Sequence, residues 1–234
     1  MKKNRTIISS DVQEANFREI RMGSIAPKTL YRSSHPIKDN GQERAHAILA
    51  AKTSIASVLN LCDTESGLQH KAFFAPWYSK LYKNNRIIAL GMDFGFTSER
   101  FNKKLNKALQ FIIKNEGPYL IHCHAGIDRT GFVSMVLESL MGATFDEILD
   151  DYVKSFYSSF ESSIYSGTIK DNYQVHVMQH LAIMGGSSYI IAHDLQVIAE
   201  HYLENTIGLT ADEIVLLKGK LSGDMFPGCN MRKT

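Results

Sequence analysis

Residues 122–131 combine a nucleophile, a tight turn and a cation in one short segment. They read His122-Cys123-His124-Ala125-Gly126-Ile127-Asp128-Arg129-Thr130-Gly131. A cysteine thiolate is a strong nucleophile, and an arginine six positions later can fork onto two oxygens of a phosphate. Gly126 permits a backbone conformation that most residues avoid, so the loop can curl around an anion. This combination fits the transfer of a phosphoryl group to sulfur.

The elements on either side of this segment predict an anion-binding site. The apolar run Tyr119-Leu120-Ile121-His122 predicts a strand that ends beside Cys123. The stretch 130–141 is apolar nearly all round, which predicts a helix buried in the core. Between such a strand and helix, the loop N–H groups and the positive helix end converge on one point. That field also favours a thiolate, so we predict Cys123 as the nucleophile and Arg129 as the clamp on the phosphate.

The other members of the segment are predicted to bind the phosphate or support the nucleophile. The predicted phosphate-binding residues are His124, Ala125, Gly126, Ile127, Asp128 and Arg129. His122 is expected to orient the loop and to stabilise the thiolate. Thr130 is expected to hydrogen-bond the sulfur as it leaves in a second step. The alternative for Cys123 is an inert buried thiol, and its spacing to Gly126 and Arg129 argues against that alternative.

The rest of the chain predicts an α/β fold. Apolar runs at 54–61, 86–90 and 119–122 predict strands covered on both faces, and 67–84 and 99–114 predict helices between them. After residue 130 the pattern is mostly helical, with helices expected at 130–141, from Thr144, at 171–184, at 187–204 and from Thr210 towards Lys220. We therefore expect a central mixed or parallel sheet of about four to five strands flanked by helices, with a helix-rich C-terminal half. A single domain is expected over 1–234, with flexible ends at 1–10 and 222–234.

Composition narrows the function classes. The chain has 234 residues, a formal net charge of +2 and three cysteines. Near-balanced charge gives no argument for nucleic acid, and no apolar run approaches the roughly 18 residues of a membrane span. Scattered cysteines and the lack of a signal-peptide core favour a cytoplasmic protein, with export by a route without a cleaved signal as the alternative. His122-Cys123-His124 has no second Cys/His pair at ligand spacing, so we expect neither a metal nor a cofactor.

A resemblance extends beyond the loop. His122-Cys123, five further residues and Arg129-Thr130-Gly131 resemble the signature of the protein-tyrosine phosphatase superfamily. Asn16-Phe17-Arg18-Glu19 and Leu30-Tyr31-Arg32-Ser33-Ser34 are similar to the opening of a mainly bacterial branch, and Leu209 to Ile214 are similar to its C-terminal helices. The resemblance implies a phosphoric monoester hydrolase that forms a cysteinyl-phosphate. For Arg32 we expect a structural salt bridge, with a contribution of positive charge near the site as the alternative.

Two aspartates compete for the role of general acid, which must protonate the leaving group. Asp93 lies in a glycine-flanked loop, Gly91-Met92-Asp93-Phe94-Gly95, 30 positions before Cys123. That separation resembles dual-specificity enzymes with a mobile acid loop. Asp128, inside the segment itself, stands where relatives of the bacterial branch are proposed to carry the acid. Both assignments stay open at this stage.

The expected substrate is phosphotyrosine on a protein, with dual specificity as an extension. The alternatives are a phosphoinositide or inositol phosphate substrate, and a phospho-binding module without turnover. Lipid-directed relatives often carry lysines in the loop, and His124 and Ile127 stand there instead, which favours a phosphorylated protein over a phospholipid. A sulfurtransferase or an arsenate reductase is a further enzymatic rival. We expect no nucleic-acid partner and no stable insertion into a membrane.

Overall fold

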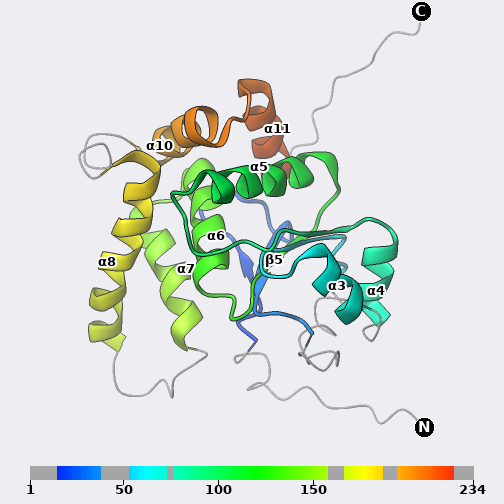
Figure 1. The fold of residues 1–234 in the computed structure, drawn as a ribbon. Coiled ribbons are helices and arrows are strands. Elements are labelled where there is room, and N and C mark those ends of the chain that lie inside the picture. The colour runs from blue at the N-terminus through cyan, green and yellow to red at the C-terminus, as the bar shows by residue number, and fades with distance from the viewer. Residues whose placement is uncertain (1–14, 38–52, 73–75, 158–165, 187–193, 224–234) are drawn as a thin grey trace, which may run out of the picture.

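The computed structural model describes residues 15–37, 53–72, 76–157, 166–186 and 194–223. Five strands form one mixed sheet in the order β1-β2-β5-β3-β4 (Figure 1). They are β1 (Arg18–Ile20), β2 (Leu30–Ser33), β3 (Ser57–Asn60), β4 (Ile87–Ala89) and β5 (Tyr119–His122). β1 runs antiparallel to β2, and the other neighbouring pairs are parallel. The predicted α/β fold with a mixed sheet is confirmed.

β5 occupies the middle of the sheet, and every one of its residues is buried. Its neighbours β2 and β3 lie parallel to it, with Ser33 and Asn60 each paired with His122. In a parallel sheet the carboxyl ends of adjacent strands share one edge, and ligands bind there. Cys123 therefore leaves the sheet at that edge.

Helices cover the sheet, and most of them agree with the periodicity of the sequence. Among the described residues they are α3 (Glu65–Ala72), α4 (Pro76–Lys83), α5 (Glu99–Lys114), α6 (Asp128–Leu140), α7 (Phe145–Tyr157), α8 (Ser166–Gly185), α10 (Leu195–Tyr202) and α11 (Ala211–Ser222). The expected helix over 187–204 begins only at Leu195 and passes into a π-helix over Leu203–Ile207, while 187–193 lie outside the described residues. The capping box predicted at Thr210 is present, with Glu213 as its partner.

α6 is the central helix of the molecule (Figure 1). Its residues from Thr130 to Leu140 are all buried, because β5, α7 and α10 pack around it. A helix held on every side is rigid, and its first turn carries the end of the candidate loop. The core therefore fixes the position of the loop from behind.

The two expected flexible ends fall largely outside the described residues. Residues 1–10 lie outside them, as do 224–234, whereas Ser222 is the last residue of α11. Within the described part of the chain, no helix has both the length and the apolar composition to cross a bilayer.

Candidate active site

Cys123 lies directly after β5, and its side chain is enclosed by the loop that follows. The residue is 2% exposed. The backbone N–H of Gly126 donates to Cys123 Sγ at 3.2 Å, so the loop curls back over the sulfur. Gly126 has a φ of +75°, and a Cβ there would lie 2.4 Å from the Ser33 carbonyl oxygen. Only glycine fits at this position, as the sequence predicted.

The loop ends at the N-terminus of α6, whose first N–H groups are free to face an anion. Ile127 stands at the N-cap and provides no side-chain capping bond. An uncapped helix N-terminus combines unpaired N–H donors with the positive end of the helix dipole. His124 and Ala125 are exposed at the mouth of the loop. The predicted phosphate-binding segment is therefore one continuous turn between strand and helix.

Arg129 faces the loop that carries Asp93. One guanidinium N–H donates to the Met92 carbonyl at 3.0 Å, and the guanidinium carbon lies 4.6 Å from the centre of the Phe94 ring. The Arg129 Nε is buried and has no hydrogen-bond partner among the described residues. A buried guanidinium N–H without a partner can donate to a bound oxyanion. Its predicted role as a phosphate clamp stays a prediction.

His122 is held by a chain of buried hydrogen bonds. Asn60 Nδ2 donates to the Tyr78 hydroxyl at 3.0 Å, and that hydroxyl lies 2.7 Å from His122 Nε2. Burial raises the pKa of Tyr78 well above its ordinary range, so the phenol keeps its proton and donates it to Nε2. His122 Nδ1 then carries the ring proton and donates to the Cys123 carbonyl at 3.3 Å. His122 thus orients the backbone at the nucleophile.

Three potential metal ligands lie beneath the loop, within 4.8 Å of one another: His35, Cys62 and His122. Both ring nitrogens of each histidine already have protein partners. His35 Nε2 lies 2.7 Å from Asp63 Oδ2, and His35 Nδ1 accepts from the Ile37 N–H at 3.0 Å. These side chains form a hydrogen-bonded support for the turn after β3.

Thr130 does not reach the sulfur in this structure. Its side chain is fully buried, and its hydroxyl has no hydrogen-bond partner among the described residues. The role expected for Thr130 in the second step therefore requires a change in its side-chain rotamer, and it stays a prediction.

The two candidate acids occupy different environments. Asp93 Oδ1 accepts from the Gly95 N–H at 3.0 Å, and its other oxygen lies 3.9 Å from Arg100 Nε. Asp128 is an exposed first residue of α6. Burial, with a contribution from the Asp128 carboxylate, raises the pKa of Tyr152 to about 12. Burial lowers the pKa of His180, and the Asp128 carboxylate partly offsets this shift. Asp128 thus acts electrostatically on residues of α7 and α8, whereas Asp93 belongs to the loop held by Arg129.

Several residues of the site escaped sequence analysis. Tyr78 comes from α4 and Asn60 from the end of β3, and neither carries a local signal because their partners are distant in sequence. Asn16 donates to the Gly126 carbonyl at 3.0 Å, and only its presence in the N-terminal motif could have pointed to it. The salt bridge expected for Arg32 is present, with Asp151 as its partner.

A family model described as the tyrosine phosphatase family matches residues 14–223. The chain belongs to that family. The predicted superfamily is therefore confirmed, and phosphatase chemistry is the activity that membership indicates. Among curated proteins, no relative of this tyrosine phosphatase family member was found.

Two solved structures are similar to this tyrosine phosphatase family member. One is the core catalytic domain of the PP-IP phosphatase SIW14 from S. cerevisiae in complex with citrate, 22% identical, with a TM-score of 0.42. The match covers 71% of this chain and 90% of the SIW14 chain. The other is a structure of the Siw14 catalytic core, 22% identical, with a TM-score of 0.43, covering 74% of this chain and 96% of its own.

Proposed function

We propose that this protein hydrolyses phosphoric monoesters through a cysteinyl-phosphate on Cys123, with phosphotyrosine as the leading substrate. The observation that carries the proposal is the enclosure of the sulfur: a buried thiol, a loop N–H 3.2 Å from it and an uncapped helix N-terminus share one turn. The loop N–H and the helix N-terminus both favour negative charge at the sulfur. A thiolate and a phosphate are the two anions that the chemistry requires there.

The reaction has two displacements. In the first, the Cys123 thiolate attacks phosphorus, the bond to the leaving oxygen breaks, and an acid gives that oxygen a proton. Arg129 and the N–H groups of 124–129 stabilise the charge on the three remaining phosphate oxygens. In the second, water attacks phosphorus, the phosphorus–sulfur bond breaks, and inorganic phosphate leaves with the thiolate restored. Asp93 or Asp128 supplies the proton in the first step and accepts one from water in the second.

An aromatic side chain at the mouth of the site supports an aryl phosphate as the substrate. Phe94 is 59% exposed although it is a large apolar side chain, and its ring lies over the Arg129 guanidinium. Exposed aromatic rings beside a cation offer a stacking surface to another ring. A phosphotyrosine whose phosphate binds at Cys123 would place its own ring near Phe94.

The deciding experiment is metal-free hydrolysis of an aryl phosphate by the wild type and by Cys123→Ser. We expect turnover in the wild type and its loss in the variant, with Cys229→Ser as the matched control that keeps full activity. A wild type that binds phosphate without turnover would favour the binding module instead. Turnover of thiosulfate or arsenate in place of the ester would favour the enzymatic rivals. Phosphotyrosine and phosphoserine peptides then test dual specificity.

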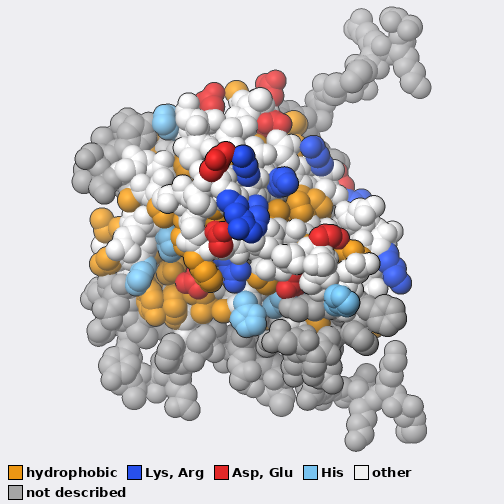
Figure 2. Space-filling model, viewed as in Figure 1, with side chains coloured by type: hydrophobic (Ala, Val, Ile, Leu, Met, Phe, Trp, Pro, Cys, Tyr) orange, Lys and Arg blue, Asp and Glu red, His pale blue; other side chains and the backbone are white. Residues whose placement is uncertain are grey.

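A second candidate substrate is a molecule with several phosphates, such as an inositol phosphate or a phosphoinositide. The observation that favours it is a cluster of cations on α5: Lys104 is half-buried with its ammonium on the Gly91 carbonyl, and the charges of Arg100 and Lys107 act on it. Lys and Arg side chains gather over α5 in Figure 2. Like charges one helical turn apart repel each other, so an anionic ligand would relieve the repulsion.

Lys107 can be tested without removing Arg100, whose Nε lies 3.9 Å from the candidate acid Asp93. Lys107→Gln should lower kcat/KM for an inositol polyphosphate about threefold and leave a phosphotyrosine peptide unchanged, because one lost ion pair at the surface carries energy on this scale. Lys114→Gln, at the other end of α5, is the matched control. An equal loss on both substrates would reject the second candidate.

A further inference from the structure

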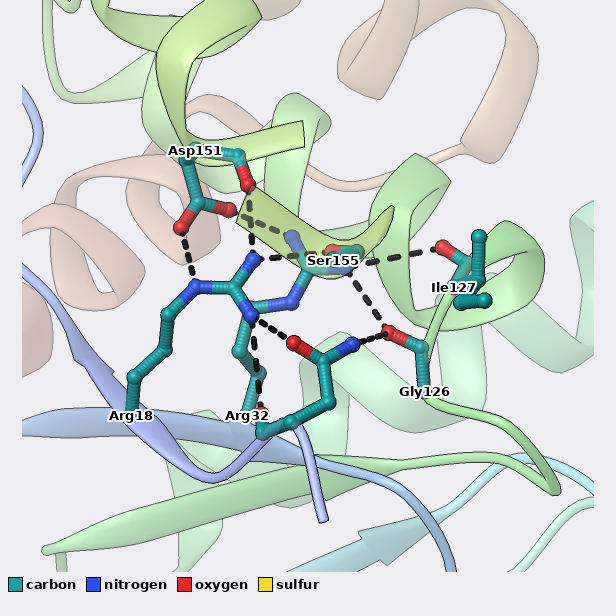
Figure 3. A network of polar contacts seen from close by, with 7 residues as sticks. Arg18, Arg32, Gly126, Ile127, Asp151 and Ser155 are labelled. Carbon is teal, nitrogen blue, oxygen red and sulfur yellow. Dashed lines mark hydrogen bonds and ion pairs between the residues drawn. The ribbon is translucent and has the colours of Figure 1, made fainter. Parts of the chain in front are cut away.

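The carbonyl group of Gly126 accepts two hydrogen bonds from behind the loop (Figure 3). Asn16 Nδ2 donates to it at 3.0 Å, and an Arg32 guanidinium N–H donates to it at 3.0 Å. The same Arg32 nitrogen lies 3.5 Å from the Ile127 carbonyl. Both donors come from the N-terminal region of the chain.

These bonds determine which way the loop N–H groups point. In a trans peptide the C=O and N–H lie on opposite sides, so fixing the Gly126 carbonyl turns the Ile127 N–H the other way. The contact with the Ile127 carbonyl does the same for the Asp128 N–H. Gly126 is also held on its other side, where its own N–H donates to Cys123 Sγ. The carbonyls therefore face Asn16 and Arg32, and the N–H groups of Ile127 and Asp128 point away from these two side chains.

The two donors are themselves fixed by a buried ion network. Arg32 is 1% exposed and pairs with Asp151, whose other oxygen lies 2.8 Å from Arg18 Nε. Arg18 also donates to the Ser155 hydroxyl at 2.9 Å and to the Asn16 side-chain oxygen. Because Arg18 occupies that oxygen, the Asn16 amide must present its Nδ2 to the loop. Figure 3 shows this network of hydrogen bonds and ion pairs between Arg18 and Gly126.

The network also carries net positive charge. Burial and the neighbouring Asp151 raise the pKa of Glu138 well above its ordinary range, which favours its neutral form. Two arginines and one ionised aspartate then leave one positive charge beneath the loop. A buried charge is weakly screened, so it favours anions on the other side of the loop.

We propose that Asn16 and Arg32 are positioning residues that hold the N–H groups of Ile127 and Asp128 toward the phosphate and favour the thiolate of Cys123. This inference rests on the proposed function, since it assumes that the phosphate binds within the 123–129 loop. It assigns a role to the two N-terminal motifs, which otherwise only resemble those of relatives. Neither residue touches the reacting atoms, so their effect passes through the backbone of Gly126.

The decisive variant is Asn16→Asp. It keeps the oxygen that Arg18 binds and replaces the donor to Gly126 with a second acceptor, which repels the carbonyl. Asn85→Asp is the matched control: Asn85 is exposed, has a similar φ of +55° against +52° for Asn16, and undergoes the same change in charge. Two readouts that need no turnover are the rate of Cys123 alkylation by iodoacetamide at pH 6, followed by mass spectrometry, and the protection of Cys123 by inorganic phosphate.

We expect Asn16→Asp to slow alkylation about tenfold and to weaken phosphate protection by a similar factor, as supporting residues around a site typically do. A variant that merely loosened the fold would expose the buried thiol and speed alkylation. Wild-type behaviour in both readouts would overturn the proposal. Should Asn16→Asp fail to fold, Asn16→Gly removes the amide without adding charge and suits the left-handed backbone, and the same two outcomes decide. A wild type that binds phosphate but hydrolyses no ester would reject the proposed function and leave the positioning role intact.

Discussion

The Arg129 guanidinium donates to the Met92 carbonyl at 3.0 Å, which joins the phosphate loop to the loop of Asp93. A phosphate bound at Cys123 would compete with this carbonyl for the same donors, because Arg129 is the predicted clamp. Substrate binding and the position of the Asp93 loop are therefore linked through one side chain. The role of Asp93 as general acid can therefore be tested against that of Asp128 by substitution.

The dependence of kcat on the leaving group distinguishes the two candidate acids. Asp93→Asn and Asp128→Asn should be compared on aryl phosphates with good and poor leaving groups. The variant that lacks the acting acid should lose about 10²–10⁴-fold in kcat on the poor leaving group and much less on the good one. Asp212→Asn, an exposed carboxylate in α11, controls for the change in charge. Equal losses on both substrates would eliminate that aspartate.

Phe94 should contribute to the preference for aryl substrates. Phe94→Ala removes the exposed ring over Arg129 and should lower kcat/KM for an aryl phosphate about fivefold, since an aromatic contact contributes about 1 kcal/mol. An alkyl phosphate should be affected less, because it offers no ring to stack. The comparison of kcat/KM for the two substrates checks this. A uniform loss would mean that Phe94 acts only through Arg129.

Tyr78 should matter for stability as well as for the nucleophile. Tyr78→Phe leaves His122 Nε2 and Asn60 Nδ2 without their shared partner, and the free energy of unfolding should fall by about 1–3 kcal/mol. Urea denaturation measures the loss. Tyr82→Phe is the control on the same helix, because its hydroxyl bonds an exposed Glu65 and its removal should change little. Equal effects of the two variants would show that the buried hydrogen bonds of Tyr78 add nothing to the free energy of unfolding.

The Asp151 carboxylate should make the protein sensitive to acid. Burial favours its protonated form, but the charges of Arg32 and Arg18 outweigh burial and hold the pKa of Asp151 below its ordinary value. The stabilisation from this ion pair is complete above the pKa of an aspartate in the unfolded chain, about 3.9. It is lost as pH falls through the lower pKa of Asp151 in the folded protein. Asp151→Asn should lower the free energy of unfolding by about 3–5 kcal/mol at pH 7 and flatten its dependence between pH 4 and 2.

The measurement for Asp151 is the urea midpoint as a function of pH, with Asp212→Asn as the control. In the control, the acid limb should match that of the wild type. Parallel curves for Asp151→Asn and the wild type would show that the lost stability arises from another carboxyl group.

Sequence analysis predicted the elements whose signals are local. The stripe of apolar residues in 99–114 gave α5 its bounds, and the run 119–122 gave β5. β1 and β2 were not predicted, because Arg18 and Arg32 interrupt their apolar character. Those arginines are polar in sequence yet bonded to a distant carboxylate, Asp151, and no local pattern shows that pairing. The same reason explains why Asn16 and Tyr78 were missed at the site.

The loop itself was predictable because its chemistry is contiguous. Cys123, Gly126 and Arg129 lie within one short segment, and the strand and helix around them follow from the apolar pattern. The support beneath the loop was not predictable, because it comes from β1, β2, α4 and α7. Thr130 shows the remaining difference: its place at the start of α6 was expected from spacing, but its hydroxyl has no hydrogen-bond partner among the described residues.

The support of Gly126 draws on residues from both sides of the 122–131 segment in the sequence, with Asn16 and Arg32 before it and Asp151 after it. A nascent chain that has just emerged through Leu140 contains the whole 122–131 segment but lacks Asp151. In that chain Arg32 lacks the partner of its salt bridge, and we expect the loop carbonyls to be less firmly held. The order of the loop therefore depends on the docking of α7, an element that follows the loop in the chain.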